Sequence, residues 1–386
     1  MRSPRSELEA ITAAGLHRRL RTLESATGPK VLREGRELWN FASNDYLGLA
    51  SHPAIRAAFH EGLDLWGHGA AASRLITGTL PPHEALEETI AKAKGTDAAL
   101  SFSSGHAAAT GSIPAIVGSG DHVVIDKLAH ACLIDGARLS GASLRVFPHN
   151  DVEKLSRLLS RIRGVSPASR ILVITESVFS MDGDLAPLRE IVETCEQHEA
   201  LLLVDEAHGL GVFGPGGMGL AEEMGLQSRI DFHMGTLGKA AGLAGAYIAC
   251  SADWRELLIN RARSFIFSTA PPPALAHAAR AAIDLLRSPQ GTALRSQLRE
   301  RMDRLRPGHS SPIFPWILGT NEAALEASAS LENQGFLVPA IRYPTVPRGT
   351  ARLRISLGAT HPLEAIDALR VLLENPPPAT RPSEAR

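Results

Sequence analysis

Short apolar runs alternate with longer stretches of helical character through the middle of the chain. The runs are rich in Val, Ile and Leu and recur roughly every 20–30 residues, which is typical of strands buried on both faces and joined by helical crossovers. This pattern predicts an α/β fold with a mostly parallel open sheet. The predicted strands are Ala98–Phe102, His122–Asp126, Leu144–Phe147, Ile171–Thr175, Leu201–Asp205, Phe232–Thr236 and Ala246–Cys250.

The N-terminal segment follows a different pattern. Ser6-Glu7-Leu8-Glu9 fits a capping box, and apolar residues follow at roughly helical spacing as far as Leu23. We therefore predict a helix that begins at Ser6 and ends before Gly28. A short strand, Leu38–Ala42, comes next.

The pattern changes again after about residue 285, to a smaller α+β region. It contains a predicted strand, Ala351–Ser356, and a helix that begins at Pro362. The chain is thus predicted to have four parts: an N-terminal helix and arm (1–45), a large α/β domain (46–285), a small C-terminal α+β domain (286–374) and a Pro-rich, disordered tail (375–386).

The composition is that of an ordinary globular protein. The 386 residues are 44% hydrophobic and 21% charged, with a formal net charge of −1. This composition supports a sizeable core and excludes a surface built to coat nucleic acid or an anionic membrane. No apolar stretch approaches the roughly 20 residues that span a bilayer, and Met1–Glu9 is polar, unlike a secretory signal. The three cysteines lack metal or redox spacing, so we expect no metal site and a cytoplasmic location.

In an open parallel sheet, ligands bind at the carboxyl ends of the strands. The polar residues directly after the predicted strands are therefore the candidates for a site. They are Ser104-Gly105-His106, Asp126 with His130, Glu176 with Ser180, Asp205 with His208, and Thr236 with Lys239.

Lys239 lies in an apolar, Gly-rich segment, Gly235–Gly242. The nearest charged residues are Asp231 and Asp253, so no solvated charged face surrounds it. A lysine in such surroundings loses its proton more readily and can form a Schiff base. A surface lysine in a loop is the alternative, and the local sequence leaves both interpretations open.

Asp205 ends an apolar run, and His208 follows three residues later. A carboxylate in this place can keep the nitrogen of a bound pyridine ring protonated, while the histidine contacts the phenolic oxygen of the ring. A simple cap or turn residue after a strand is the alternative. His130 could stack on a planar cofactor, although a structural histidine is favoured when His130 is considered alone.

Two Gly-containing segments bear on phosphate binding. Ser104-Gly105-His106 precedes a predicted helix of small residues, whose N-terminal N–H groups could hold a phosphate; a plain strand-to-helix turn is the alternative. Gly209–Gly214 fits the spacing G-x-G-x-x-G of dinucleotide-binding proteins. However, Asp-Glu-Ala-His separates these glycines from the strand and Pro215 opposes a helix. We therefore reject a nicotinamide site and predict an extended loop.

Taken in order, several segments resemble the α-oxoamine synthase family of fold-type I pyridoxal-phosphate enzymes. The resemblance runs from about Gly15 to His361. The segments that carry it are Asn40–Leu49, Ser73–Thr79, Val178–Leu188, Val204–Gly209, Thr236–Ala240 and Phe267–Thr269. The resemblance implies a mostly parallel central sheet with flanking helices, a smaller α+β C-terminal domain, and a homodimer with sites at the subunit interface.

The resemblance also implies roles for individual residues. Lys239 would hold pyridoxal 5′-phosphate as a Schiff base and act as the base at the α-carbon of the amino acid. Asp205 would pair with the pyridinium nitrogen, His208 would contact the phenolic oxygen, and His130 would stack on the ring and contact substrate. Further cofactor contacts would come from Gly105, His106, Ser180 and Thr236, and substrate contacts from Arg18 (the acyl group), Arg354 (the amino acid carboxylate) and Ser356. An exposed strand residue paired with a surface acid is the alternative for Arg354.

The implied reaction is a decarboxylative condensation of L-alanine with pimeloyl-CoA or a pimeloyl carrier protein. Other reactions of the family stay open, namely those of 2-amino-3-ketobutyrate–CoA ligase, 5-aminolevulinate synthase and serine palmitoyltransferase. A plain aminotransferase and a non-catalytic pyridoxal-phosphate subunit are further alternatives. The presence together of Lys239, Asp205, His208 and His130 argues against the non-catalytic subunit.

The chain departs from the family pattern in two places. Where relatives usually have an aromatic residue and then Asn, this chain has His106 and Ala109. Ala70-Ala71-Ala72 replaces a more Gly-rich stretch before Ser73. We expect cofactor binding to be kept, with altered contacts at these positions.

Overall fold

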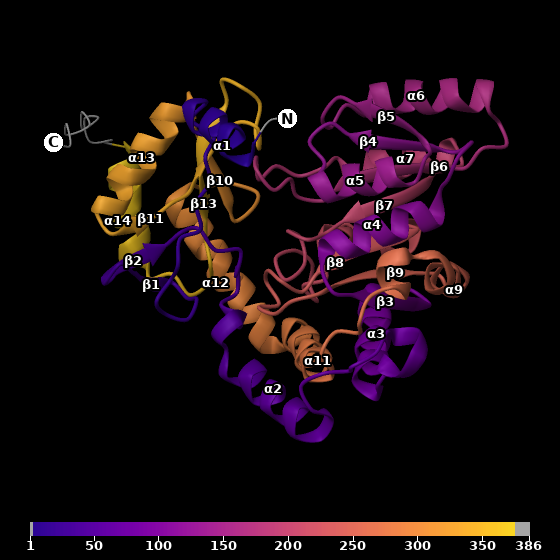
Figure 1. Ribbon diagram of the computed structural model, residues 1–386, viewed down its shortest axis with the longest axis horizontal. Coiled ribbons are helices and arrows are strands. Elements are labelled where there is room, and N and C mark those ends of the chain that lie inside the picture. Colours follow the sequence, from indigo (N-terminus) through magenta and orange to yellow (C-terminus); the bar gives the residue numbers. More distant parts are fainter. Residues whose placement is uncertain (1–2, 375–386) are drawn as a thin grey trace. The chain divides into compact units, whose positions relative to one another are not determined.

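The computed structural model describes residues 3–374, which fold as two compact units (Figure 1). One unit is Asp45–Arg299, and the other combines the chain up to Asn44 with the chain from Glu300 onward. The sequence pattern suggested boundaries after 45 and 285 and a separate N-terminal arm. The first boundary of the structure falls after Asn44, within one residue of this expectation, and the second falls within helix α12 (Pro289–Leu305). The structure joins the arm to the C-terminal region because strand β2 (Arg36–Asn40) pairs in parallel with β11 (Phe336–Leu337).

A seven-stranded sheet forms the centre of the Asp45–Arg299 unit. Its strand order is β3-β9-β8-β7-β6-β4-β5, and β9 alone runs against the others, which confirms the predicted, mostly parallel sheet. Five strands have the predicted bounds, and β5 and β6 are each one residue longer. The strands are β3 (Ala98–Phe102), β4 (His122–Asp126), β5 (Ser143–Phe147), β6 (Ile171–Glu176), β7 (Leu201–Asp205), β8 (Phe232–Thr236) and β9 (Ala246–Cys250).

Apolar side chains on both faces explain why these runs form buried strands. Val123 and Ile125 of β4 belong to a core cluster that includes residues of α4, α5 and α9, while Val124 on the opposite face of the strand is also fully buried. Helix α7 contacts β7, and α6 packs on α7. The helices of this unit are α2 (Pro53–Trp66), α3 (Pro81–Lys94), α4 (Gly105–Ile116), α5 (Ala131–Leu139), α6 (Val152–Val165), α7 (Leu188–Gln197), α8 (Leu220–Glu223), α9 (Ala252–Arg261), α10 (Arg263–Ile266) and α11 (Pro273–Arg287), with short 3₁₀ or π turns η1 (Leu49–Ser51), η2 (Arg74–Gly78) and η3 (Gln227–Arg229).

The other unit is a smaller α+β assembly with two three-stranded sheets. Their orders are β1-β2-β11 and β10-β13-β12. The predicted strand over residues 351–356 is β13, and the helix predicted to begin at Pro362 begins at Leu363; the tail 375–386 lies outside the described residues. The remaining elements of this unit are α1 (Pro4–Ala13), β1 (Lys30–Arg33), β10 (Ile313–Gly319), α13 (Asn321–Asn333), β12 (Ala340–Ile341), β13 (Ala351–Ser356) and α14 (Leu363–Glu374).

The N-terminal helix is shorter than predicted and begins earlier. Its cap is Ser3, whose hydroxyl accepts the Ser6 N–H at 3.2 Å, and Pro4 occupies the first helical turn. Gly15 has a φ of +66°, a left-handed conformation that ends the helix just after Ala13. The prediction of a helix from Ser6 to the neighbourhood of Gly28 was therefore wrong at both ends.

The loop that follows β7 surrounds a buried ion pair. Lys94, at the end of α3, is fully buried and contacts both the Glu206 carboxylate and the Met218 carbonyl. Gly219 has a φ of +115°, and a Cβ there would lie 2.1 Å from Glu206 Oε2, so the chain can follow this path only with glycine. The glycines at 209–214 belong to this turn-rich loop and open no helix, as predicted.

Replacement of Lys94 by Met tests this ion pair. The substitution leaves the Glu206 carboxylate buried without its cation, so we expect unfolding in urea to cost about 3–5 kcal/mol less free energy than for the unchanged protein. Lys92→Met, on the exposed face of the same helix, is the matched control and should stay within about 0.5 kcal/mol. A Lys94→Met/Glu206→Gln double variant should recover part of the loss. Equal stabilities of the two single variants would contradict this interpretation.

Candidate active site

The carboxyl ends of the parallel strands bring the predicted residues to one edge of the sheet. Glu176 ends β6 opposite Asp205 at the end of β7, and Asp205 lies opposite Met234 of β8. Thr236 at the end of β8 and Phe102 at the end of β3 both lie opposite Ala246 of β9, which runs between these two strands. The loops that leave this edge therefore start side by side, which is the usual place for a ligand in such a sheet.

Lys239 lies in direct contact with His208. Its Nζ is 2.7 Å from His208 Nε2, and His208 Nδ1 is 2.6 Å from the hydroxyl of Tyr46. His208 and Tyr46 are buried, and Lys239 is partly buried. A lysine held against a buried histidine is not the exposed loop lysine that the local sequence left open.

Asp205 and Glu176 form a pair of buried carboxylates. Burial raises the pKa of Asp205, an effect that the Lys239 cation opposes. Burial, and then the Asp205 charge, raise the pKa of Glu176 well above its usual range. Asp205 Oδ1 accepts the Ala207 N–H at 2.9 Å, whereas the described residues supply no hydrogen bond to Oδ2. One oxygen of a buried carboxylate is thus available to a ligand.

His130 caps helix α5 and is held in one orientation by two donors. Its Nδ1 accepts the Cys132 N–H at 3.3 Å and lies 3.0 Å from Cys132 Sγ. Burial raises the pKa of the Cys132 thiol to about 12, so the sulfur keeps its proton. Partial burial of the imidazole, opposed by the Asp205 charge, lowers the pKa of His130 itself. A neutral imidazole with both donors on Nδ1 carries its proton on Nε2.

The other predicted cofactor residues of this unit occupy neighbouring loops. Helix α4 begins at Gly105 with Ser104 as its cap, and the N–H groups of Gly105 and His106 have no acceptor among the described residues. The His106 side chain is exposed and lies 3.8 Å from an Asp135 carboxylate oxygen. Thr236 accepts the Gly238 N–H at 3.2 Å through its hydroxyl. Ser180 is buried in the loop that follows β6.

The predicted substrate residues belong to the other unit. Arg354 and Ser356 are buried on β13, where an Arg354 N–H donates to the Ser356 hydroxyl at 2.8 Å and to Asn44 Oδ1 at 3.0 Å. This burial rules out an exposed strand residue paired with a surface acid. Arg18 is exposed and reaches the Thr345 hydroxyl at 3.5 Å.

A third charged cluster supports the loops of the site. His149 donates to Asp126 Oδ1 at 3.0 Å and to Asp184 Oδ2 at 2.7 Å, and its ring meets Phe179 edge-on. Burial alone would lower the pKa of His149, but these two hydrogen bonds raise it to about 10. A protonated His149 therefore ties the end of β4 to the loop that carries Ser180.

The two departures from the family pattern have structural settings. Ala109 is fully buried where α4 meets α5, and a Cβ on Gly136 would lie 2.6 Å from the Ala109 carbonyl oxygen. A side chain at position 136 therefore has no space without movement of the helices, so the two helices meet closely beside Ala109. Ala71 has a φ of +55°, the left-handed conformation in which glycine is unstrained.

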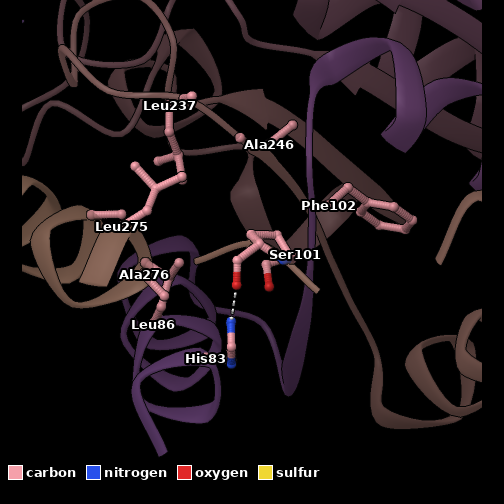
Figure 2. A pocket seen from close by; sticks show the side chains of 12 residues that line it. His83, Leu86, Ser101, Phe102, Leu237, Ala246, Leu275 and Ala276 are labelled. Carbon is pink, nitrogen blue, oxygen red and sulfur yellow. Dashed lines mark hydrogen bonds between the residues drawn. The ribbon is translucent and has the colours of Figure 1, made fainter. Parts of the chain in front are cut away.

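A small cavity lies beneath the loop that carries Lys239 (Figure 2). Leu237, Ala246, Phe102 and Leu275 line it together with other, mainly apolar side chains, and about 20 Å³ of space remains. His83 at its polar end hydrogen-bonds the Pro271 carbonyl at 2.9 Å. None of the predicted site residues lines it, and it has room for about one water molecule, so we interpret it as a packing cavity.

The sheet, and the lysine, histidine and aspartate at its carboxyl edge, define a fold-type I pyridoxal-phosphate enzyme. Residues 36–371 match the family described as aminotransferase class I and II. The 8-amino-7-oxononanoate synthase of Geobacter sulfurreducens is 50% identical over 93% of this chain and 94% of that protein. That of Anaeromyxobacter dehalogenans is 48% identical over 97% and 96%.

Solved structures agree with these sequence relatives. A serine palmitoyltransferase from S. paucimobilis with a bound PLP–myriocin aldimine has a TM-score of 0.89 and 30% identity, covering 96% of this chain and 95% of that one. An 8-amino-7-oxononanoate synthase from Francisella tularensis has a TM-score of 0.72 and 27% identity, covering 87% and 97%. The chain belongs to the class I and II aminotransferase family and, within it, to the α-oxoamine synthases, whose cofactor is pyridoxal 5′-phosphate.

The residues at the sheet edge fit this cofactor. A buried carboxylate with a raised pKa and one available oxygen, Asp205 Oδ2, suits a ring nitrogen that becomes cationic. The start of α4 presents N–H groups without acceptors, as a phosphate requires. Within residues 3–374, no helix is both long and apolar enough to cross a membrane.

The structure adds residues that the sequence did not single out for a role. Tyr46 contacts His208 from 162 positions away, and Glu176 accepts the His130 N–H at 2.6 Å. Cys132 and His149 hold the two flanking loops. Glu176 stood among the polar residues after the strands, so its position gave a signal; the contact of Tyr46 depends on the tertiary fold alone.

The pH dependence of unfolding tests the His149 cluster. Because the folded-state pKa of about 10 is above the ordinary value of 6.5, the stability that His149 contributes is complete below pH 6.5 and is lost as the pH rises through 10. A His149→Gln variant lacks this contribution. We expect the difference in urea midpoint between the two proteins to shrink steadily between about pH 6 and about pH 10. A difference that is independent of pH would show that His149 is not protonated in the folded protein.

Proposed function

We propose that this protein joins L-alanine to a pimeloyl thioester with loss of CO₂, which forms 8-amino-7-oxononanoate. The observation that carries the proposal is the contact of Lys239 with buried His208, beside the carboxylate of Asp205, in a chain 45–50% identical to several 8-amino-7-oxononanoate synthases over nearly its full length. The sequence-based assignment of a role to each residue stays a proposal.

Pyridoxal phosphate, when bound, supplies an electron-withdrawing ring that stabilises negative charge at the α-carbon of an amino acid. Lys239 would hold it covalently, and Asp205 would hold the ring nitrogen as a cation. His208 would contact the phenolic oxygen, and His130 would stack on the ring. The phosphate would be bound by Thr236 and at the start of α4, by Gly105 and His106. Ser180 would also contact the cofactor.

The chain's own residues would move the protons of the reaction. The Lys239 amine, when unprotonated, would take the α-proton of alanine, and the partly buried setting of Lys239 limits competition from water. The reaction then forms a C–C bond to the thioester carbonyl and releases the thiol and CO₂. His130, with a proton on Nε2, would donate it to assist the loss of CO₂.

Arg354 would bind the carboxylate of alanine. A buried guanidinium, held by Asn44 and Ser356, is fixed in orientation, which favours a bidentate ion pair with a carboxylate. Arg18 would contact the acyl substrate from its exposed position in the same unit.

One observation favours a second candidate, because serine palmitoyltransferases have the higher TM-scores, up to 0.91. These palmitoyltransferases are nevertheless only about 30% identical to this chain, whereas the 8-amino-7-oxononanoate synthases are 45–50% identical. Fold similarity does not distinguish these reactions, whereas the higher sequence identity supports the pimeloyl substrate.

Measurement of thiol release from a matrix of substrates tests the proposal. Pimeloyl-CoA, acetyl-CoA, succinyl-CoA and palmitoyl-CoA are each paired with alanine, glycine and serine, and a pimeloyl carrier protein is included as a second donor. We expect the highest kcat/KM with alanine and a pimeloyl donor, and a loss of at least about 10²-fold in Lys239→Ala. Faster turnover of serine with palmitoyl-CoA would instead support the second candidate.

We also propose that the protein is a homodimer in the cytoplasm. Ile76 and Phe267 are 77% and 71% exposed, and their segments are joined by a β-bridge between Ser73 and Thr269. Two large apolar side chains on adjoining exposed segments suit an interface with a second copy. All three cysteines are unpaired and buried, which suits a reducing compartment.

Sedimentation of an Ile76→Glu variant tests the dimer. A charge in the centre of an apolar interface is costly to desolvate, so we expect the dissociation constant to rise at least about tenfold. Val165→Glu places the same charge on an exposed apolar residue far along the chain, at the end of α6, and should leave the dimer intact. A monomeric unchanged protein, or an unaffected Ile76→Glu dimer, would overturn the proposed interface.

A further inference from the structure

The side chain of Tyr46 connects to Lys239 through one histidine. The Tyr46 ring is fully buried, its hydroxyl lies 2.6 Å from His208 Nδ1, and His208 Nε2 lies 2.7 Å from Lys239 Nζ. The three groups thus form a continuous chain of short contacts, from the start of the Asp45–Arg299 unit to the lysine.

The backbone around Tyr46 is fixed in place against the loop that carries Lys239. Asp45 caps the following turn by accepting the N–H groups of Leu49 and Ala50 at 2.8 and 3.1 Å. A Cβ on Gly242, which has a φ of +72°, would lie 2.3 Å from Leu49 and Ala50 backbone atoms. The lysine loop and the Tyr46 turn therefore touch without any intervening side chain.

The same turn also contacts the loop that carries His208. Gly211 of that loop has a φ of +79° and packs against Leu47 and Ala240. A Cβ on Gly211 would lie 3.4 Å from the Leu47 side chain and 2.5 Å from the Ala240 side chain. Leu47 is fully buried. Tyr46 is thus held between the two loops whose functional side chains it joins.

We propose that Tyr46 is a positioning residue that fixes the tautomer and ring orientation of His208. This inference rests on the proposed function. A lysine nitrogen that takes a proton must first be unprotonated, and its lone pair can then accept a hydrogen bond from His208 Nε2. Nδ1 must in turn be the acceptor, and the Tyr46 hydroxyl is the donor that lies against it.

The neighbouring charges are consistent with this direction of donation. Asp205 ends the preceding strand and interacts with Lys239, and Glu206 is turned away toward Lys94. Tyr46 and Lys239 both lie in hydrogen-bonding contact with the His208 ring. A phenol O–H donates to the unprotonated nitrogen of a neutral imidazole.

Tyr46→Phe removes the hydroxyl and keeps the ring that fills the core. In the cofactor-loaded protein we expect the pH midpoint of the visible absorbance to shift by about one unit. We expect kcat to fall about tenfold while KM for alanine changes less than about twofold. Tyr247→Phe is the matched control, since Tyr247 is equally buried and interacts with Lys94. Its absorbance midpoint and kcat should stay unchanged.

An absorbance midpoint and kcat in Tyr46→Phe that match those of Tyr247→Phe would reduce Tyr46 to a packing residue and overturn the proposal. Nitrogen-15 NMR of histidine-labelled unchanged protein gives a second test that needs no folded Tyr46 variant. We expect His208, assigned by comparison with His208→Gln, to show an unprotonated Nδ1 and a protonated Nε2, and the reverse tautomer would overturn the proposal. Neither the absorbance titration nor the NMR requires turnover, so both remain informative if the proposed substrates fail.

Discussion

The burial of two carboxylates at the ends of adjacent strands is the constraint on which the site depends. Glu176 and Asp205 lie opposite each other in the register of β6 and β7, and both are buried. Burial raises the pKa of each, since a buried negative charge without a partner is unfavourable. The Glu176 carboxylate receives the N–H of His130, but Asp205 keeps an oxygen that no described residue bonds. A cationic ligand atom at that oxygen lowers the energy of the whole pair, which is why this strand end suits a pyridinium nitrogen.

The loops around these carboxylates are held by charges that take no part in the proposed chemistry. Lys94 and Glu206 fix the path of the chain immediately after Asp205, and His149 joins the end of β4 to the loop after β6. Each cluster pairs opposite charges that are largely removed from water, so loss of one member leaves the other unpaired. The edge of the sheet thus combines rigid supports with one carboxylate oxygen left for a ligand, which is the arrangement that precise cofactor placement requires.

How well the sequence predicted the fold depended on the range of the interactions that decide each feature. The strands of the central sheet have apolar runs that end in polar residues, so their shared edge and, to within one residue, their bounds were predicted. The prediction of the N-terminal helix failed because Ser3 and Gly15, not the leucine pattern, determine where the helix begins and ends. The union of the arm with the C-terminal region depends on pairing of Trp39 with Phe336, nearly three hundred positions apart by sequence number. Such long-range pairing leaves no periodic signal.

The candidate site shows the same division. Lys239, Asp205 and His208 were predicted because they follow strands and match a family, and the structure brings them together. The donor behind His208 and the donors behind His130 could not be predicted, since Tyr46 and Cys132 have no distinctive spacing. A residue that orients a reacting group is harder to predict than the reacting group itself. It is recognised by a hydrogen bond that forms only in the folded chain.

Proteins named for different products share this fold, so the choice of acyl chain cannot follow from the sheet edge alone. A serine palmitoyltransferase and an 8-amino-7-oxononanoate synthase both superimpose over most of the chain, with TM-scores of 0.89 and 0.72. The residues proposed to hold the cofactor and move protons would serve any of these reactions equally. Discrimination among acyl chains must therefore come from differential contacts to the chain itself, where each methylene contributes only about 1–3 kcal/mol. His106, exposed beside Asp135, stands where relatives usually have an aromatic residue. At this position the chain differs from its relatives, while the carboxylates and the lysine that define the class are unchanged.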